Sequence, residues 1–341
     1  MSAGGNYLES VRYPVLVGDI GGTNGRFALL SGKDAKLISF PNVRTADYAN
    51  IDDAIRAAIL PAAPQPPKTT ILAIAGPVNS DEIELTNCPW VVRPRVMMET
   101  LGFEEVIVLN DFEAQALAVV ALDKEHLEQI GGGEVDPVAG RVVLGPGTGL
   151  GVAGLINARG VWQPVPGEGG HVDVGPRSAR DFEIFPHLEK IEGRISAEQI
   201  LCGRGMMSLY RAVCAASGVS TQFSEPQEVT AGAMTHGNRW AKETLSLFAT
   251  FLGRVAGDMA LVFMAKGGVY LSGGIAQKIL PVLKQGEFRA AFNDKAPHGE
   301  IMAQMPVFVM THPLAAVIGL AAFARNPARF GVNMSGRHWH G

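Results

Sequence analysis

With 341 residues, of which 47% are hydrophobic and 18% charged, the chain can bury a full core, and its length favours two domains over one. Its formal net charge of -4 and its three scattered cysteines, which form no CxxC or Cys/His cluster, argue against nucleic-acid binding, a disulfide framework and structural zinc. The N-terminus has no signal-peptide pattern and no apolar run reaches the roughly 20 residues that span a bilayer, so we expect a cytoplasmic protein, away from membranes, whose partners are small molecules.

The first part of the chain predicts a β-meander followed by alternating helices and strands. In chain order we expect strands at 15–20, in FALL and in KLISF, a helix over 47–60, strands at 71–76 and 106–111, and a helix over 112–122. Because strands and helices alternate, this part predicts a partly parallel sheet.

The second part repeats the alternation with longer helices. We expect strands in RVVLGP and LGVAGLI, helices over 178–190, 196–216 and 238–265, a strand in VYLSGG, a helix from 275, a strand in VFVMT and a final helix over 313–325. Two blocks, GDIGGTNGRFALL and LGPGTGLGVAGLI, each place a strand pair around a glycine turn, which indicates a duplicated architecture with a cleft between the halves. Residues 326–341 show no periodicity, and we expect a frayed tail rather than a metal site at His338 and His340.

The first glycine turn is typical of a phosphate-binding loop. Asp19 ends a buried strand and precedes a turn that includes Gly21, Gly22, Thr23 and Asn24. Backbone N–H groups and a hydroxyl can approach phosphate oxygens closely in such a turn, and Asp19 can hold Mg²⁺ through water. The alternative is an ordinary hairpin turn with a capping aspartate.

Two later glycine turns repeat this pattern. Gly147, Thr148 and Gly149 follow a strand, and Gly273 and Gly274 lie between a strand and a helix. Neither the Walker pattern nor a GxGxxG that opens a helix is present, which argues against P-loop and Rossmann proteins. We expect the turns to hold a triphosphate.

Asn110 and Asp111 end a strand just before a helix, where side chains can meet a ligand. Phosphoryl transfer to an alcohol needs a carboxylate that accepts the hydroxyl proton, and Asp111 can serve as that base. The alternative is that Asp111 caps the helix.

Three further polar residues suit a polyhydroxylated ligand: Glu168 and His171 in a glycine-rich loop, and Glu198 in the expected first turn of a helix. Two alternatives remain open here. Glu168 and His171 can be metal ligands, and Glu198 can merely favour the helix N-terminus.

Taken together and in this order, the motifs resemble the bacterial glucokinases of the hexokinase and actin-like superfamily. The residues that carry the resemblance, between about 15 and 325, are DIGGTNGR, LTNCPW, LNDFEAQA, GPGTGLGVA, PGEGGHVDVG, ISAEQIL and FRAAFNDK. The resemblance implies an α/β, two-domain ribonuclease H-like (actin-like ATPase) fold with an inter-domain cleft. It also implies phosphorylation of D-glucose to glucose 6-phosphate by Mg-ATP, and a homodimer.

The resemblance also assigns roles to individual residues. It makes Asn110 a sugar ligand and Asp111 the catalytic base, and it makes Glu168, His171 and Glu198 sugar ligands. ATP phosphates would bind the turns at 19–24 and 147–149, and no residue is expected to be a dedicated metal ligand. The implied domains are a small one, 1–110 plus 313–325, a large one, 111–312, and the tail 326–341.

The sequence departs from the family's motifs at two places and lacks two features of related proteins. Gly25 stands where alanine is common, and HPLAAVIG at 312–319 replaces the more usual NPGLLG, near the expected adenine contacts. The cysteine-rich zinc motif of the related repressor and kinase group is absent, and no helix-turn-helix precedes the first strand. The remaining alternatives are a kinase for another hexose, a non-catalytic sugar- and ATP-binding actin-like protein, and a metal hydrolase.

Overall fold

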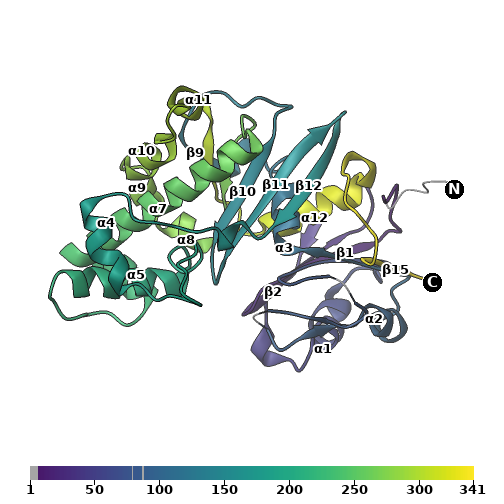
Figure 1. Cartoon of the computed structure of the whole chain (residues 1–341). Helices are drawn as coiled ribbons and strands as arrows, with labels where there is room; N and C mark the ends of the chain where they lie inside the picture. The colour runs from purple at the N-terminus through teal and green to yellow at the C-terminus, as the bar shows by residue number, and fades with distance from the viewer. Residues whose placement is uncertain (1–6, 79, 87) are drawn as a thin grey trace. The chain divides into compact units, whose positions relative to one another are not determined.

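The computed structural model describes residues 7–78, 80–86 and 88–341 of the chain (Figure 1). Contacts divide the chain into two compact units. Unit 1 comprises Met1–Asp123, Leu155–Pro166 and His312–Gly341, and unit 2 comprises Lys124–Gly154 and Gly167–Thr311. The domain limits inferred from the sequence stay a prediction.

Unit 1 is built on a mixed sheet with the strand order β15–β8–β5–β1–β2–β3, in which β4 also pairs with β2. β1 is parallel to β5 and β5 to β8, whereas β2 runs antiparallel to β1. The strands are β1 (Val15–Ile20), β2 (Asn24–Leu30), β3 (Leu37–Ser39), β4 (Val43–Arg44), β5 (Thr69–Ile74), β8 (Glu105–Asn110) and β15 (His338–His340). The predicted meander and the parallel strands are therefore confirmed.

Helices cover the sheet of unit 1 on both sides (Figure 1). One apolar cluster joins the sheet to α1 (Ile51–Ala54) and α2 (Pro94–Leu101). Opposite them, α12 (Ala315–Arg325) packs on β1, β5 and α3 (Asp111–Ala118). A short hairpin is formed by β6 (Ile83–Glu84) and β7 (Val91–Val92), and Asn87 of the LTNCPW motif lies outside the described residues.

The second sheet has the strand order β12–β11–β10–β13–β14–β9. β10, β13 and β14 are parallel to one another, and β9 is antiparallel to β14. The strands are β9 (Leu127–Gly131), β10 (Arg141–Pro146), β11 (Leu150–Ala158), β12 (Val161–Gly167), β13 (Val269–Leu271) and β14 (Val307–Met310). Although they belong to strands of this sheet, residues 155–166 of β11 and β12 are part of unit 1.

The helices of unit 2 pack around one long helix, α7 (Arg239–Phe263). By length and composition α7 could cross a membrane, but its most apolar stretch is 56% buried, as in the core helix of a soluble protein. The other helices are α4 (Ala179–Ile184), α5 (Gly203–Ala216), α6 (Pro226–Met234), α8 (Gly273–Lys278), α9 (Leu280–Leu283), α10 (Glu287–Asn293) and α11 (Gly299–Gln304).

Several expected helices begin later or end earlier than predicted, and the one expected over 112–122 already ends at Ala118. The helix expected over 47–60 starts at Ile51 and continues as a π turn (Ile55–Ile59) and a 3-10 turn (Leu60–Ala62). The helix expected over 178–190 becomes a 3-10 turn at Phe185, because Pro186 has no N–H to continue the α-helix. The helix expected from 196 begins only at Gly203.

The expectation of a frayed tail is wrong. Phe330, Val332 and Trp339 are buried, and β15 pairs antiparallel with β8. A strand of three residues between glycines leaves no periodicity to read, so its pairing depends on a partner far away in the sequence.

The close packing of α3 and α12 is testable at Gly319. A Cβ atom there would lie 2.1 Å from the Ala114 carbonyl oxygen and 2.8 Å from the Ala118 nitrogen. Alanine should therefore push the helices apart and lower the free energy of unfolding by about 1–3 kcal/mol, although alanine favours a helix over glycine. Urea unfolding measures this change. Gly32→Ala, where nothing lies within 4 Å, is the control, and equal stability of the two variants would contradict the packing.

Candidate functional site

The turn between β1 and β2 presents Thr23 at its exposed tip. The Gly21 N–H donates to the Asn24 oxygen at 3.0 Å. Thr45 braces the turn from outside, because its N–H donates to the Thr23 oxygen at 3.0 Å and its hydroxyl donates to the Gly22 oxygen at 2.9 Å. The turn is thus fixed while the Thr23 side chain stays open to solvent.

Asp19 lies directly across from Arg26 in the β1–β2 register. An Arg26 guanidinium N–H donates to Asp19 Oδ2 at 3.2 Å, and the aspartate side chain is only 17% exposed. Burial raises the pKa of Asp19, and the attraction to Arg26 offsets this only in part. Arg26 therefore compensates the negative charge of the buried carboxylate only in part.

Asn110 and Asp111 form the start of α3 at the end of β8. The Phe112 N–H lies 2.9 Å from Asn110 Oδ1 and 3.0 Å from Asp111 Oδ1. The Asn110 N–H donates to Glu113 Oε2 at 3.2 Å, which completes a capping box. The capping position belongs to Asn110, and Asp111 is the first helical residue.

Strand register brings these two parts of unit 1 to one edge of the sheet. Ile20 pairs with Ile74, and Ile74 pairs with Asn110. Because adjacent strands are spaced by about 4.8 Å, the turn after β1 and the Asn110–Asp111 pair are about 10 Å apart across the sheet. Carboxyl ends of parallel strands are the usual place for a ligand in such sheets.

The corresponding turn in unit 2 is held at both of its ends. The Gly147 N–H donates to the Gly149 oxygen at 2.8 Å, and the Gly203 N–H donates to the Gly147 oxygen at 2.9 Å. Thr148 is exposed at the tip. Gly273, at a φ of +86°, lies so close to this turn that a Cβ atom would be 2.9 Å from the Pro146 oxygen. Unit 2 thus brings the second and third glycine turns together.

Glu168 and His171 lie on a tight turn beside the start of β11. The His171 N–H donates to the Glu168 backbone oxygen at 2.9 Å. The Glu168 side chain is 90% exposed, and that of His171 is 55% exposed. Between them Gly170 has no room for a side chain, because a Cβ atom would lie 2.0 Å from the Leu150 oxygen. Both polar side chains are therefore accessible next to the start of β11.

Glu198 is not in the first turn of a helix, and this expectation is wrong. Its N–H donates to the Gly170 oxygen at 2.8 Å, and its Oε2 accepts the Leu150 N–H at 2.8 Å. These contacts replace helical hydrogen bonds, and α5 begins only at Gly203. A Cβ atom on Gly149 would lie 2.5 Å from Oε2. Glu198 therefore ties the turn with Glu168 and His171 to the turn with Thr148.

Sequence reasoning missed two supporting residues, Thr45 and Glu113. The Asn-x-x-Glu spacing of Asn110 and Glu113 is a readable capping-box signal. No local pattern marks Thr45, whose contacts are 22 residues or more away in the chain. Among the described residues, no group of three or more His, Cys, Asp or Glu side chains could hold a metal ion.

Comparison with known proteins identifies the family of the chain. The family model described as Glucokinase matches residues 16–327. A glucokinase of Chelativorans sp. (strain BNC1) is 63% identical over 327 residues, 96% of each chain. The chain belongs to the glucokinase family. The family's activity, ATP-dependent phosphorylation of glucose, and the predicted class of phosphotransferase are thereby confirmed.

Solved structures extend the likeness to the fold. A glucokinase from an Antarctic psychrotroph has a TM-score of 0.81 at 31% identity and covers 92% of this chain and 98% of its own. A glucokinase from Balamuthia mandrillaris, in complex with glucose, has a TM-score of 0.74 at 24% identity over 91% of this chain and 93% of its own. The predicted actin-like ATPase fold class is confirmed.

The buried carboxylate of Asp19 should lower stability at neutral pH. Because its pKa is raised in the folded state, the folded protein binds the proton more tightly, and the unfavourable charge is relieved as pH falls. Asp19→Asn should therefore raise the midpoint of thermal unfolding at pH 7, and the advantage should shrink toward acidic pH. Asp53→Asn, at a 49% exposed side chain, is the control, and a lower midpoint for Asp19→Asn at pH 7 would contradict the argument.

Proposed function

We propose that Asp111 is the general base of glucose phosphorylation. It accepts the proton of the 6-hydroxyl while that oxygen forms a bond to the γ-phosphorus of ATP and the bond to the β–γ bridging oxygen breaks, which yields glucose 6-phosphate and ADP. The observation that carries the proposal is the place of Asp111, half-buried at the first turn of α3, with its Oδ1 3.0 Å from the Phe112 N–H.

Glucose hydroxyls are bound by Asn110, Glu168, His171 and Glu198. Each carboxylate accepts two hydrogen bonds, so a complete set of partners rejects sugars that lack a hydroxyl. The exposed side chains of Glu168 and His171 support this role, because they are open to a ligand. Bound glucose displaces water that would otherwise compete as nucleophile.

ATP phosphates are bound by the glycine turns. The residues are Gly21, Gly22, Thr23, Asn24, Gly147, Thr148, Gly149, Gly273 and Gly274. Asp19 fits a hydrated Mg²⁺, because its partly compensated carboxylate lies at the end of β1. The ion neutralises charge on the β- and γ-phosphate oxygens when it is bound.

The setting of this activity is also a proposal. The protein works as a homodimer in the cytoplasm, without nucleic acid or membrane partners, and its domains are 1–110 plus 313–325 and 111–312. A coupled assay with ATP and a panel of sugars tests the activity, and turnover of glucose below that of another hexose would overturn the proposed substrate.

Asp111→Asn tests the general base. The amide cannot accept the proton, so kcat should fall by roughly 10² or more while glucose affinity changes little. A coupled assay gives kcat, and glucose titration of tryptophan fluorescence gives the affinity. Asp34→Asn, at an exposed turn in the same unit, should behave as wild type. Near-normal turnover of Asp111→Asn would remove the residue from this role.

Substitutions of Glu168 and Glu198 should differ in their effect on the KM for ATP. Glu198→Ala removes the acceptor of the Leu150 N–H and loosens the turn with Thr148, so the KM values for glucose and ATP should both rise. Loss of a charged hydrogen bond corresponds to about tenfold. Glu168→Ala should raise the KM for glucose alone, because its side chain is 90% exposed and lies beside His171, away from the turn with Thr148. Steady-state kinetics with each substrate varied gives both KM values. An unchanged KM for ATP in Glu198→Ala would contradict the link that Glu198 makes between the two turns.

A further inference from the structure

The C-terminal segment 328–341 lies outside the residues that the glucokinase family model matches, 16–327. It nevertheless ends on the strand that carries Asn110. His338 pairs with Ile107, and His340 pairs with Glu105, in the β15–β8 register. The Arg337 oxygen accepts the Val108 N–H at 3.0 Å. The segment therefore runs along β8 with Arg337 nearest the site.

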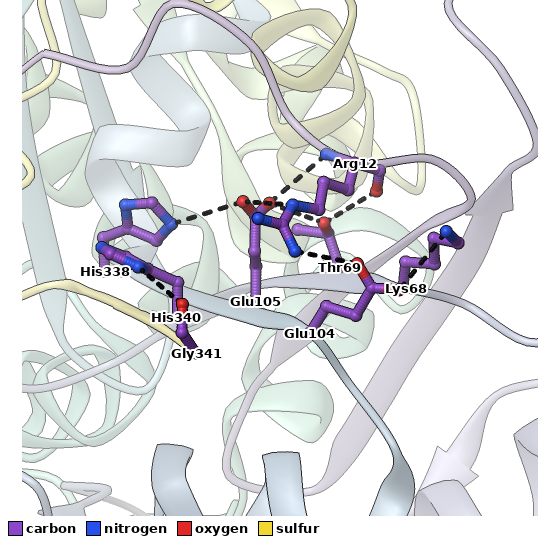
Figure 2. Close-up of polar contacts among 8 residues, drawn as sticks. All are labelled: Arg12, Lys68, Thr69, Glu104, Glu105, His338, His340 and Gly341. Atoms are coloured by element: carbon purple, nitrogen blue, oxygen red, sulfur yellow. Dashed lines mark hydrogen bonds and ion pairs between the residues drawn. The ribbon is translucent and has the colours of Figure 1, made fainter.

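Polar contacts fasten the far end of β15 near the start of β8 (Figure 2). Glu105 is buried, and its Oε2 accepts the Thr69 hydroxyl at 2.8 Å and the Arg12 N–H at 3.3 Å. The His338 ring lies on the other side of this carboxylate, with Nε2 4.0 Å from Oε1. Trp339 is buried and its Nε1–H donates to Asp81 Oδ1 at 2.6 Å. The strand is thus anchored independently of Arg337.

At the near end, Arg337 reaches the capping box of α3. One guanidinium nitrogen, Nη1, lies 2.9 Å from Glu113 Oε1 and 2.7 Å from Oε2. The Glu113 side chain is 3% exposed and that of Arg337 is 21% exposed. The same Glu113 Oε2 accepts the Asn110 N–H at 3.2 Å. A chain of contacts therefore links the C-terminal segment to the residue that precedes Asp111.

We propose that Arg337 is a positioning residue that fixes Asn110 and Asp111 through Glu113. The inference rests on the proposed roles of Asn110 and Asp111. Arg337 orients the buried Glu113 carboxylate, and Glu113 in turn holds the Asn110 backbone at the start of α3.

The physical argument is the cost of an unpaired buried charge. Removing one partner of a buried ion pair leaves the other uncompensated, so Glu113 would reorient toward water. This change weakens its bond to the Asn110 N–H, and the first turn of α3 loses that half of its capping box. A displacement of about 1 Å at a reacting group can lower the rate by about 10²-fold.

The test compares Arg337→Ala, Arg337→Lys and Trp339→Phe in the full-length protein. Trp339→Phe loosens the same segment by removing its bond to Asp81 and leaves Glu113 untouched. We expect Arg337→Ala to lower kcat about 10- to 100-fold and to raise the KM for glucose with an unchanged KM for ATP. Arg337→Lys, which keeps the charge, should recover part of the rate, and Trp339→Phe should keep wild-type kcat.

Coupling to Glu113 is tested in a double-mutant cycle. Because Arg337 acts through Glu113, adding Arg337→Ala to Glu113→Gln should lower kcat by much less than it does in the wild-type background. Thermal unfolding of every variant, measured alongside, shows that the proteins compared are folded.

Several results would overturn the inference. One is wild-type kcat and glucose KM in Arg337→Ala. Another is an equal loss of kcat in Arg337→Ala and Trp339→Phe at equal loss of stability, which would mean that the segment only stabilises the fold. In both cases an active wild-type protein and an inactive Asp111→Asn would leave the proposed general base standing, so the two failures are distinguishable.

Discussion

The proposed chemistry depends on one constraint: the N–H groups at the first turn of α3 have no acceptor within the helix. Strand β8 ends and the helix begins without an intervening loop, so the orphan donors must be satisfied by Asn110, Asp111 and Glu113 themselves. Their hydrogen bonds fix where the Asp111 carboxylate lies relative to the strand. The turn after β1 shares the same sheet edge, which places the proposed base and the proposed phosphate-binding turn on one sheet.

Unit 2 reaches comparable rigidity by backbone contact. Gly170 and Gly149 lie where any side chain would strike Leu150 or Glu198, so the two turns close on each other through main-chain atoms. Glu198 then joins them with one N–H and one carboxylate oxygen. A substitution in one of these turns should therefore displace the other, and with it the proposed sugar- and phosphate-binding groups.

Much of the fold was predictable because its signals are local. Buried strands such as 15–20 and 106–110 are continuous apolar runs, and the glycine turns that follow them mark the site. Asn110, Asp111, Glu168 and His171 were predicted as site residues because polar residues at strand ends and in glycine turns are conspicuous.

The errors arise where distant contacts override a local pattern. Residues 196–202 have helical periodicity, but Glu198 bonds to Gly170 and Leu150 instead of to its neighbours. The C-terminal segment has no pattern, and its pairing and the Arg337–Glu113 ion pair join residues 224 or more positions apart. No propensity or spacing encodes such a contact, because it exists only after the sheet has formed.

The most direct test of the central claim is a crystal structure with glucose and a non-hydrolysable ATP analogue. The account predicts an Asp111 carboxylate oxygen about 2.6–3.2 Å from the 6-hydroxyl oxygen, with that hydroxyl aimed at the γ-phosphorus. A bound glucose whose 6-hydroxyl meets another group, with Asp111 held only by the Phe112 N–H and its own unit, would contradict it.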